Sequence, residues 1–494
     1  MAEVRTNVPA RLDRLPWARW HWMIVIGLGT VWVLDGLEVT IVGNLSGRLA
    51  EKGSGLPITQ SQVTGFGAAT YVLGACLGAL FFGWLTDRFG RKKLFMLTLG
   101  VYLFGTAMTA LSFHAWWFFL FRFITGAGIG GEYAAINSAI DELIPARYRG
   151  RIDIVINGTY WAGAAFGALL TVPILTQLPV SWGWRVAFGL GVVLGLVILL
   201  VRRHVPESPR WLFIHGRGDE ANGLVEDVEK TVEREDKVTL EPAEKYITIR
   251  QRQTIGFGRI ASTLVRHYPK RAALGLSLFI GQAFLYNAIT FGFAQILQTF
   301  FQVPSGSTGY YFAVIAVGNL AGPLLLARLF DTLGRKVMIT GTYVLSGVLL
   351  LVTAWLFGAG VLNAVTLTAC WCVVLFFASA GASSAYLTVS EIFPMETRAL
   401  AIAFFYAVGT AAGGITGPLL FAELVGSGKV GDTVLAFAIG AILMIAAGAV
   451  EAVLGVRAEQ KSLEDLATPL TATGSDGGPP DPGKSPEVDA ARPA

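Results

Sequence analysis

Two charged segments each occur twice in an otherwise apolar chain. Asp87–Lys92 (Asp-Arg-Phe-Gly-Arg-Lys) returns as Asp331–Lys336 (Asp-Thr-Leu-Gly-Arg-Lys), and Glu142–Arg149 returns as Glu391–Arg398, each beginning Glu-[Leu/Ile]-[Ile/Phe]-Pro and ending in Arg. The two offsets, 244 and 249 residues, are nearly equal. Such ordered repeats indicate a duplicated unit, and many secondary transporters are built from duplicated membrane halves.

The composition places the chain in a lipid bilayer. Of its 494 residues, 53% are hydrophobic and only 15% are charged, which is typical of polytopic membrane proteins and excludes a water-soluble domain. The formal net charge of +4 does not indicate nucleic acid as a partner, because the basic residues form no patch interleaved with aromatic residues. The three cysteines lack metal-ligand spacing, so we expect no metal and no cofactor.

Apolar segments long enough to cross a bilayer recur along the chain. A spanning helix needs about 20 mainly apolar residues. Such segments lie near 20–44, 62–86, 94–113, 116–138, 153–177 and 183–202, and again near 272–299, 307–328, 337–357, 362–388, 399–424 and 432–456. We therefore predict an all-α membrane protein with twelve transmembrane helices in two pseudo-symmetric six-helix bundles.

The loops between these segments differ in charge. Lys and Arg gather on one side, and the loops near 114, 304 and 360 on the other side contain none. By the positive-inside rule the basic side is cytoplasmic. We expect a multi-pass protein of the plasma (inner) membrane with both termini in the cytoplasm.

These patterns predict five regions. They are a cytoplasmic N-terminus (1–19), an N-terminal bundle (20–202), a cytoplasmic central loop with short helices (203–270), a C-terminal bundle (271–456) and a cytoplasmic tail (457–494). Within the loop, Asp219–Asp236 has the charge pattern of a soluble amphipathic helix. The tail is rich in Pro, Gly, Ser and Asp, so we expect it to be disordered.

Several motifs resemble one family of transporters. Gly83–Lys92 (Gly-Trp-Leu-Thr-Asp-Arg-Phe-Gly-Arg-Lys) resembles the signature between the second and third helices of the major facilitator superfamily. Pro206–Leu212 after helix six and Glu391–Pro394 after helix ten resemble the sugar porters and their organic-ion and metabolite relatives. The resemblance covers about 20–456. It implies the major facilitator fold and a central substrate site that opens alternately to each side, often with proton coupling.

The chain departs from the sugar-porter pattern where that pattern binds sugar. Helix seven reads Gly281–Asn287 (Gly-Gln-Ala-Phe-Leu-Tyr-Asn) in place of Gln-Gln-x-x-Gly-x-Asn, and helix ten has Ala382–Ser383 and Tyr386 in place of Gly-Pro and Trp. Asp35–Glu38 is similar to aromatic-acid and organic-ion symporters, and Gly130–Tyr133 to metabolite and phosphate symporters. The resemblance therefore favours a small polar metabolite or organic anion over a sugar.

Two carboxylates and one arginine fall inside predicted membrane helices. Asp35 and Glu38 lie one turn apart, roughly 22 to 27 Å along helix one, and Arg122 in helix four can reach the same depth. A carboxylate there costs about 2.5 to 3.5 kcal/mol unless it is paired, wetted or protonated. We expect the three to couple transport to protons, because opening the site changes the proton affinity of such a carboxylate. A permanent ion pair, or direct binding of an anion by Arg122, are the alternatives.

Polar side chains within the helices are candidates for binding the solute, with hydrogen bonding between helices as the alternative role. Those we assign to the substrate site are Glu132, Asn157, Gln282, Tyr286, Asn287 and Tyr386. The resemblance to sugar porters supports Gln282 and Asn287 in particular.

The repeated charged segments are candidates for a cytoplasmic gate. Opposite charges at helix ends can form ion-pair networks in one conformation only, and such a network biases the equilibrium between conformations. The simpler alternative is that these arginines only set the topology. The predicted gate residues are Asp87, Arg88, Arg91, Glu142, Arg149, Glu207, Asp331, Arg335, Glu391 and Arg398.

Together these features predict a secondary active transporter that works by alternating access, with proton symport. A uniporter or exporter of the same fold, including a sugar transporter, and a non-transporting membrane sensor remain alternatives. An enzyme is not expected, because the chain has no nucleophile–base pair, metal cluster or phosphate loop. The expected partners are a small solute, protons and the lipid bilayer, with the monomer as the functional unit.

Overall fold

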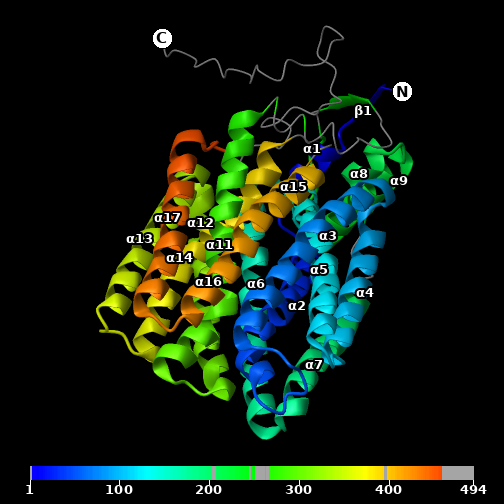
Figure 1. Ribbon diagram of the computed structural model, residues 1–494. Helices are drawn as coiled ribbons and strands as arrows, with labels where there is room; N and C mark the ends of the chain where they lie inside the picture. Colours follow the sequence, from blue (N-terminus) through cyan, green and yellow to red (C-terminus); the bar gives the residue numbers. More distant parts are fainter. Residues whose placement is uncertain are drawn as a thin grey trace, which may run out of the picture.

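The computed structural model is a bundle of long helices (Figure 1). It describes residues 3–202, 207–243, 246–250, 268–393 and 398–458, with Ser262 and Arg266. Side chains are not described at 3–5, 87, 91, 134–142, 146, 198, 200–202, 210, 214, 236, 247–250 and 398–400. The tail that the sequence predicts to be disordered lies almost wholly outside the described residues.

The first half contributes six long helices. They are α2 (Arg19–Ala50), α3 (Ala68–Phe89), α4 (Arg91–Ala110), α5 (Ala115–Leu143), α6 (Ala146–Gln177) and α7 (Val180–Arg202). One π-helical segment, η1 (Gln62–Gly67), leads directly into α3. Glycine at φ +90° (Gly90) ends α3 and begins α4, so the turn between them needs no further residue.

The second half repeats this arrangement. Its helices are α11 (Pro269–Phe301), α12 (Thr308–Thr332), α13 (Arg335–Gly358), α14 (Ala364–Ile392), α15 (Arg398–Thr410), α16 (Thr416–Gly426) and α17 (Val430–Leu454). A π-helical segment, η4 (Ala411–Ile415), joins α15 and α16 into one rod, and a 3-10 turn, η3 (Ser305–Ser307), leads into α12. Gly334, at φ +100°, repeats the role of Gly90.

Eleven helices in the described part of the chain are long and apolar enough to cross a membrane. Helix α5, with 29 residues, is a further long helix packed among them, against α3 and α4. The predicted fold class is therefore confirmed. Most helices extend several residues past the apolar segments, because their charged and polar ends continue the helix beyond the membrane thickness.

The two halves meet along several helix pairs, of which three make the most extensive contacts. Helix α6 packs against α12, α3 against α15, and α2 against α11. Within the first half, helices approach closely at glycines: a methyl group added to Gly36 of α2 would lie 1.7 Å from the Tyr160 carbonyl oxygen of α6. Gly163 repeats this contact against Val33 at 1.7 Å. Small residues at such crossings are the usual means by which membrane helices pack.

Short elements cover one end of the bundle, at the top in Figure 1, which we call the loop end. The opposite end is the far end. The loop-end elements are β1 (Glu3–Thr6), α1 (Val8–Asp13), α8 (Pro209–Ile214), α9 (Gly218–Asp236) and β2 (Ile247–Arg250). Strands β1 and β2 form an antiparallel pair that the sequence did not predict. Helix α9 coincides with the predicted amphipathic segment.

An ion-pair cluster ties α1 to α9. Arg11 donates to both Glu229 oxygens, at 3.0 and 2.5 Å, and Arg14 donates to Oε1 at 2.5 Å. Partial burial of Glu229 opposes its ionisation, but the hydrogen bonds and charges of Arg11 and Arg14 outweigh burial and lower the pKa of the Glu229 carboxyl below its ordinary value of 4.5. The N-terminal segment is thereby held against the central loop.

This cluster predicts acid-sensitive docking of the N-terminal segment. A carboxyl whose pKa is lowered by folding stabilises the folded form above its ordinary pKa, and that stabilisation is lost as pH falls through the lowered value. Below pH 4.5 we therefore expect faster hydrogen–deuterium exchange in α1, and Glu229→Gln should produce it at neutral pH. The control is Glu226→Gln, which removes only an exposed pair with Lys230. Unchanged exchange in Glu229→Gln would contradict the prediction.

Candidate substrate cavity, coupling site and gates

A cavity of about 130 Å³ lies between the two halves. Its lining residues are Trp32, Val39, Tyr71, Val72, Tyr133, Asn157, Tyr160, Trp161, Gln282, Ala283, Tyr286, Asn287, Thr290, Ser379, Ala382, Ser383, Tyr386, Tyr406 and Thr410. Both halves contribute, so any molecule held here contacts both.

Five of the six predicted substrate residues line this cavity: Asn157, Gln282, Tyr286, Asn287 and Tyr386. Glu132 does not. It is fully buried in α5, one turn after Gly128, whose Cα faces Tyr102 of α4. The neighbouring residue, Tyr133, faces the cavity instead. Adjacent positions on a helix point about 100° apart, and in α5 it is the Tyr133 side that meets the cavity.

Aromatic rings form much of the cavity wall. Trp32 stacks on Tyr133 with centroids 4.7 Å apart, and Tyr133 meets Tyr406 edge to face at 5.1 Å. On the other side Trp161 lies 5.3 Å from Tyr286. Sequence analysis did not assign Trp32, Tyr133 or Tyr406 to the site. The sequence contains a signal for two of them: Trp32 precedes Asp35 by one turn, and Tyr133 directly follows Glu132.

Hydrogen bonds within and between helices hold three of the polar lining residues in place. The Tyr286 hydroxyl donates to Asn319 Oδ1 of α12 at 3.2 Å, and Asn287 Nδ2 donates to the Ala283 carbonyl at 2.8 Å. Asn157 Nδ2 donates to the Asp153 carbonyl at 2.9 Å. These bonds fix the orientation of the cavity amides. An amide that is held in one orientation favours solutes with a matching group, because no ordering cost is paid when they bind.

Four helices surround the Glu38 carboxylate in the first half. Oε1 accepts from the Thr106 hydroxyl of α4 at 3.0 Å and lies 3.5 Å from Arg122 Nη1 of α5. A methyl group on Gly191 of α7 would lie 2.5 Å from Oε2, so glycine leaves the space that this oxygen needs. Glu38 and Arg122 are both fully buried. The predicted pair is thus brought together, and Asp35 lies nearby, buried in α2.

Arg122 connects this carboxylate to the cavity. Its guanidinium lies 4.7 Å from the centroid of the Tyr71 ring and 5.9 Å from that of Phe188. Tyr71 also lines the cavity. The attraction between a cation and an aromatic ring is stronger when both are away from water. The Tyr71 ring lies against Arg122 and also borders the solute space, so it contacts both the charged pair and the cavity. Arg122 itself does not line the cavity.

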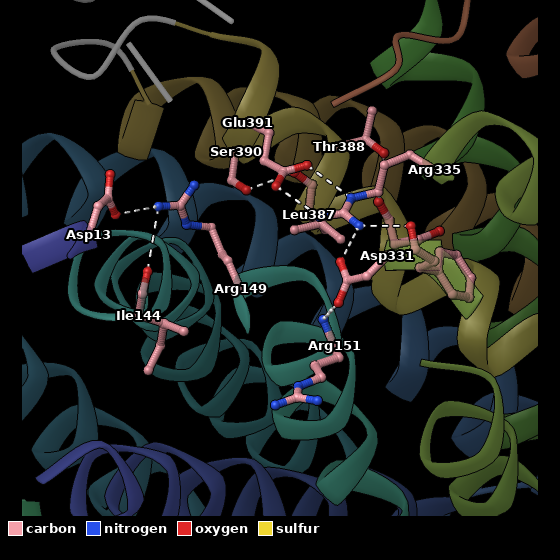
Figure 2. Close-up of polar contacts among 12 residues, drawn as sticks. Asp13, Ile144, Arg149, Arg151, Asp331, Arg335, Leu387, Thr388, Ser390 and Glu391 are labelled. Carbon is pink, nitrogen blue, oxygen red and sulfur yellow. Dashed lines mark hydrogen bonds and ion pairs between the residues drawn. The ribbon is translucent and has the colours of Figure 1, made fainter. Parts of the chain in front are cut away.

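A buried network occupies the loop end of the second half. Arg335 is bidentate to Glu391, at 3.1 and 3.2 Å, and donates to Asp331 Oδ1 at 2.6 Å and to the Phe330 carbonyl at 2.9 Å. Figure 2 shows Arg335 between the two carboxylates. All three charged side chains are less than a tenth exposed. Charge-assisted bidentate bonds of this kind are the strongest that side chains form.

This network reaches across to the first half. Asp331 Oδ2 accepts from the backbone N–H of Arg151 in α6 at 3.1 Å (Figure 2). A methyl group on Gly150 would lie 2.4 Å from both Arg335 Nη2 and Asp331 Oδ1. The contact therefore requires glycine at this position, and it closes the loop end between the halves.

The first-half counterpart is arranged differently. Arg149 is fully buried and donates to Asp13 of α1 at 3.3 Å and to the Ile144 carbonyl at 3.4 Å (Figure 2). Its expected partner Glu142 has no described side chain. Glu207 accepts from the Lys92 backbone N–H at 3.3 Å. The exposed Arg88 lies over Trp84 and Phe89. The side chains of Asp87, Arg91 and Arg398 are also outside the described set.

Hydrogen bonds between the halves close the far end, including one from the Ser305 hydroxyl to the Glu51 carboxylate. Thr64 donates to Gln295 Oε1 of α11 at 2.9 Å, and Gln295 Nε2 donates to the Ser61 hydroxyl at 3.2 Å. Gln60 Nε2 donates to Gln298 Oε1 at 3.1 Å. Sequence analysis missed these residues because isolated Gln and Ser carry no motif. The halves are thus in contact at both ends, and the cavity lies between these two sets of contacts.

The far-end contacts predict that Gln295→Ala opens this gate. The variant loses two bonds to the first half, each worth about 0.5 to 1.5 kcal/mol net, so we expect a several-fold faster reaction of a cysteine at Thr290, a cavity residue, with an impermeant maleimide from the far side. The native cysteines would be replaced beforehand. Gln302→Asn is the control, since the Gln302 amide bonds only within its own turn among the described residues. Equal rates in all three proteins would refute the gate.

Comparison with known proteins places the chain in a family. The family described as "Sugar (and other) transporter" matches residues 22–463. A niacin transporter of Acinetobacter baylyi is 27% identical over 93% of this chain and 99% of its own length. A putative metabolite transport protein of Escherichia coli is 27% identical over 94% of this chain and 97% of its own length.

Solved structures agree on the fold. The proton:xylose symporter bound to 6-bromo-6-deoxy-D-glucose superposes with a TM-score of 0.73 at 19% identity, covering 91% of this chain and 98% of the symporter. A human organic anion transporter superposes with a TM-score of 0.61 at 17% identity, covering 87% and 99%. The chain belongs to the sugar (and other) transporter family of the major facilitator superfamily: it is a multi-pass membrane protein and a secondary transporter of small molecules, not an enzyme.

Proposed function

We propose that this protein is a proton symporter for a small metabolite built on a single aromatic or heteroaromatic ring. The observation that carries the proposal is the aromatic cavity with the buried Glu38–Arg122 pair against its Tyr71 wall. The aromatic cavity suits a flat ring with polar substituents. The buried Glu38–Arg122 pair suits a proton that is bound and released. Their shared contact at Tyr71 gives coupling a physical route.

The size and lining of the cavity support a ring substrate. A cavity of about 150 Å³ holds benzene in a protein interior, and the volume here is about 130 Å³. Ring faces such as Trp32 and Tyr133 offer offset or edge-on stacking, worth about 0.5 to 1.5 kcal/mol per pair beyond burial. The amides of Gln282 and Asn287 can bond a ring substituent. A relative is named for niacin, which is a ring of this kind.

Proton coupling follows from the state of Glu38. As an anion, Glu38 is bound by Arg122 and Thr106. When Glu38 is protonated it no longer pairs with the guanidinium, and Arg122 moves towards Tyr71. The position of Tyr71 then differs between the two states, and a solute that contacts Tyr71 binds them unequally. A ligand shifts a conformational equilibrium only through such differential binding. Asp35, one turn away on the same helix, is assigned to the same proton path.

Each of the two gates is assigned to one side of the membrane. We assign the loop end to the cytoplasm of the plasma membrane, with both termini there, because Lys and Arg gather in its loops. The Arg335 network then holds the cytoplasmic gate closed, with Arg149 and Glu207 as further contacts, and the Gln295 contacts hold the outer gate closed. The monomer contains both gates and the cavity, so it is the functional unit.

Uptake into proteoliposomes tests the proposal. With an acidic exterior we expect accumulation of a labelled single-ring solute, with nicotinamide and nicotinate as the two probes, and none of xylose. Exchange without gradient-driven accumulation would instead indicate a uniporter, and saturable binding without any flux would indicate a sensor. Accumulation of xylose alone would contradict the ring substrate while leaving proton symport intact.

A further inference from the structure

The charges around the cavity restrict the substrate further. In the described part of the chain, the cavity lining contains no Lys or Arg and no Asp or Glu. Arg122 is the buried cation near it, and that guanidinium faces Glu38 and is covered on the cavity side by the Tyr71 ring. A carboxylate in the cavity would thus lose its hydration without gaining a cationic partner, which is among the costliest changes for an ion.

The lining offers neutral hydrogen bonds instead. Amides of Asn157, Gln282 and Asn287 and hydroxyls of Ser383 and Thr410 surround the space. Such groups can donate to and accept from an uncharged amide. They cannot neutralise a carboxylate, because none of them carries a positive charge.

One donor in the wall has no partner in the described residues. Trp32 Nε1 is buried and makes no hydrogen bond, although the indole is only 4% exposed. A buried N–H without an acceptor is destabilising, so a cavity occupant with a carbonyl oxygen at this point binds more tightly than one without it. Thr410 Oγ1, also in the lining, likewise has no hydrogen-bond partner in the described part.

Resting on the ring substrate proposed above, we propose that the cavity takes its ring in an uncharged, amide-bearing form and rejects the corresponding carboxylate, with Trp32 Nε1 donating to the amide oxygen. Symport of an uncharged solute with a proton moves one positive charge per cycle. Transport is then driven by membrane potential as well as by the pH gradient, whereas an anion carried with one proton moves no net charge.

Three probes of one shape test the charge preference: benzamide, benzoate and benzamidine. Binding to the purified full-length protein at neutral pH is measured by tryptophan fluorescence, and charge movement by recording currents from proteoliposomes on a solid-supported membrane. We expect benzamide to bind at least tenfold more tightly than benzoate or benzamidine, and a benzamide jump to carry positive charge inward. Benzoate binding as tightly as benzamide, or benzamidine binding most tightly, would overturn the inference while leaving a ring substrate in place.

A matched pair of variants tests the donor. Trp32→Phe keeps the ring and removes the N–H, so benzamide affinity should fall about tenfold, as expected for one hydrogen bond to an otherwise unsatisfied group. Trp371→Phe removes an equally buried indole N–H without a partner in the described residues, but outside the cavity, and should leave affinity unchanged. Equal affinities in both variants would overturn the assignment to Trp32. If none of the probes binds wild type, the ring substrate itself fails.

Discussion

Glu38→Gln is expected to abolish accumulation driven by a pH gradient while exchange of solute across the membrane continues. The amide cannot take up or release a proton, yet it retains the shape that Gly191 accommodates and can still bond Thr106. One proton per solute allows about a tenfold concentration ratio for each pH unit. In the variant the solute concentration should become equal on the two sides of the membrane. Counterflow and gradient-driven uptake in the same vesicles separate the two activities.

A second buried carboxylate provides the control for this prediction. Glu451 in α17 is fully buried, and neither of its oxygens has a hydrogen-bond partner among the described residues, but it lies in the other half and away from the cavity. Glu451→Gln should therefore keep its accumulation. Retained accumulation in Glu38→Gln would show that the Glu38–Arg122 pair only holds α2 and α5 together. The alternative in which Arg122 binds an anion would instead appear as lost exchange.

Arg335→Gln should release the loop-end gate. The change leaves Glu391 and Asp331 buried without their cation, and breaking a buried pair in this way costs about 3 to 5 kcal/mol. We expect the Asp331 bond to the Arg151 backbone N–H, which joins the two halves, to form only in the closed conformation, so that part of the cost falls on that conformation. We expect the distance between spin labels at Phe89 and Leu333, both exposed at the loop end, to increase in most molecules.

Two further variants distinguish gating from damage to the fold. Arg328→Gln removes an exposed arginine of α12, the helix that carries Asp331, and should leave the label distance unchanged. Gly150→Ala keeps every charge but places a methyl group 2.4 Å from Arg335 and Asp331, so it should also widen the distance. If both Arg335→Gln and Gly150→Ala retain the closed distance, the network does not gate.

The parts that could be predicted from the sequence are those governed by local rules. Twelve helices follow from segments that are long and apolar enough to span a bilayer. The meeting of Glu38 with Arg122 follows from their shared depth, since a buried carboxylate needs a partner. The cluster of Asp331, Arg335 and Glu391 follows from the repeated charged segments, because both segments are expected at helix ends on the same side of the membrane.

The remainder depends on contacts between distant segments. Arg149 pairs with Asp13 because the N-terminal segment folds back over the loop end, and nothing near either residue indicates this. The aromatic wall arises where Trp32, Tyr133 and Tyr406 from three helices converge. Tyr133 lines the cavity and Glu132 does not, and a helix that is apolar on most faces does not reveal from the sequence which face meets the cavity.

The measurement that tests proton symport most directly is proton movement on addition of solute. Proteoliposomes with lightly buffered medium would receive unlabelled nicotinamide with no imposed gradient, and the external pH would be followed with a glass electrode or an impermeant dye. The symport mechanism predicts alkalinisation of the medium that accompanies solute entry in wild type and is absent in Glu38→Gln. Carrier-mediated entry at the wild-type rate with no change in external pH would contradict it.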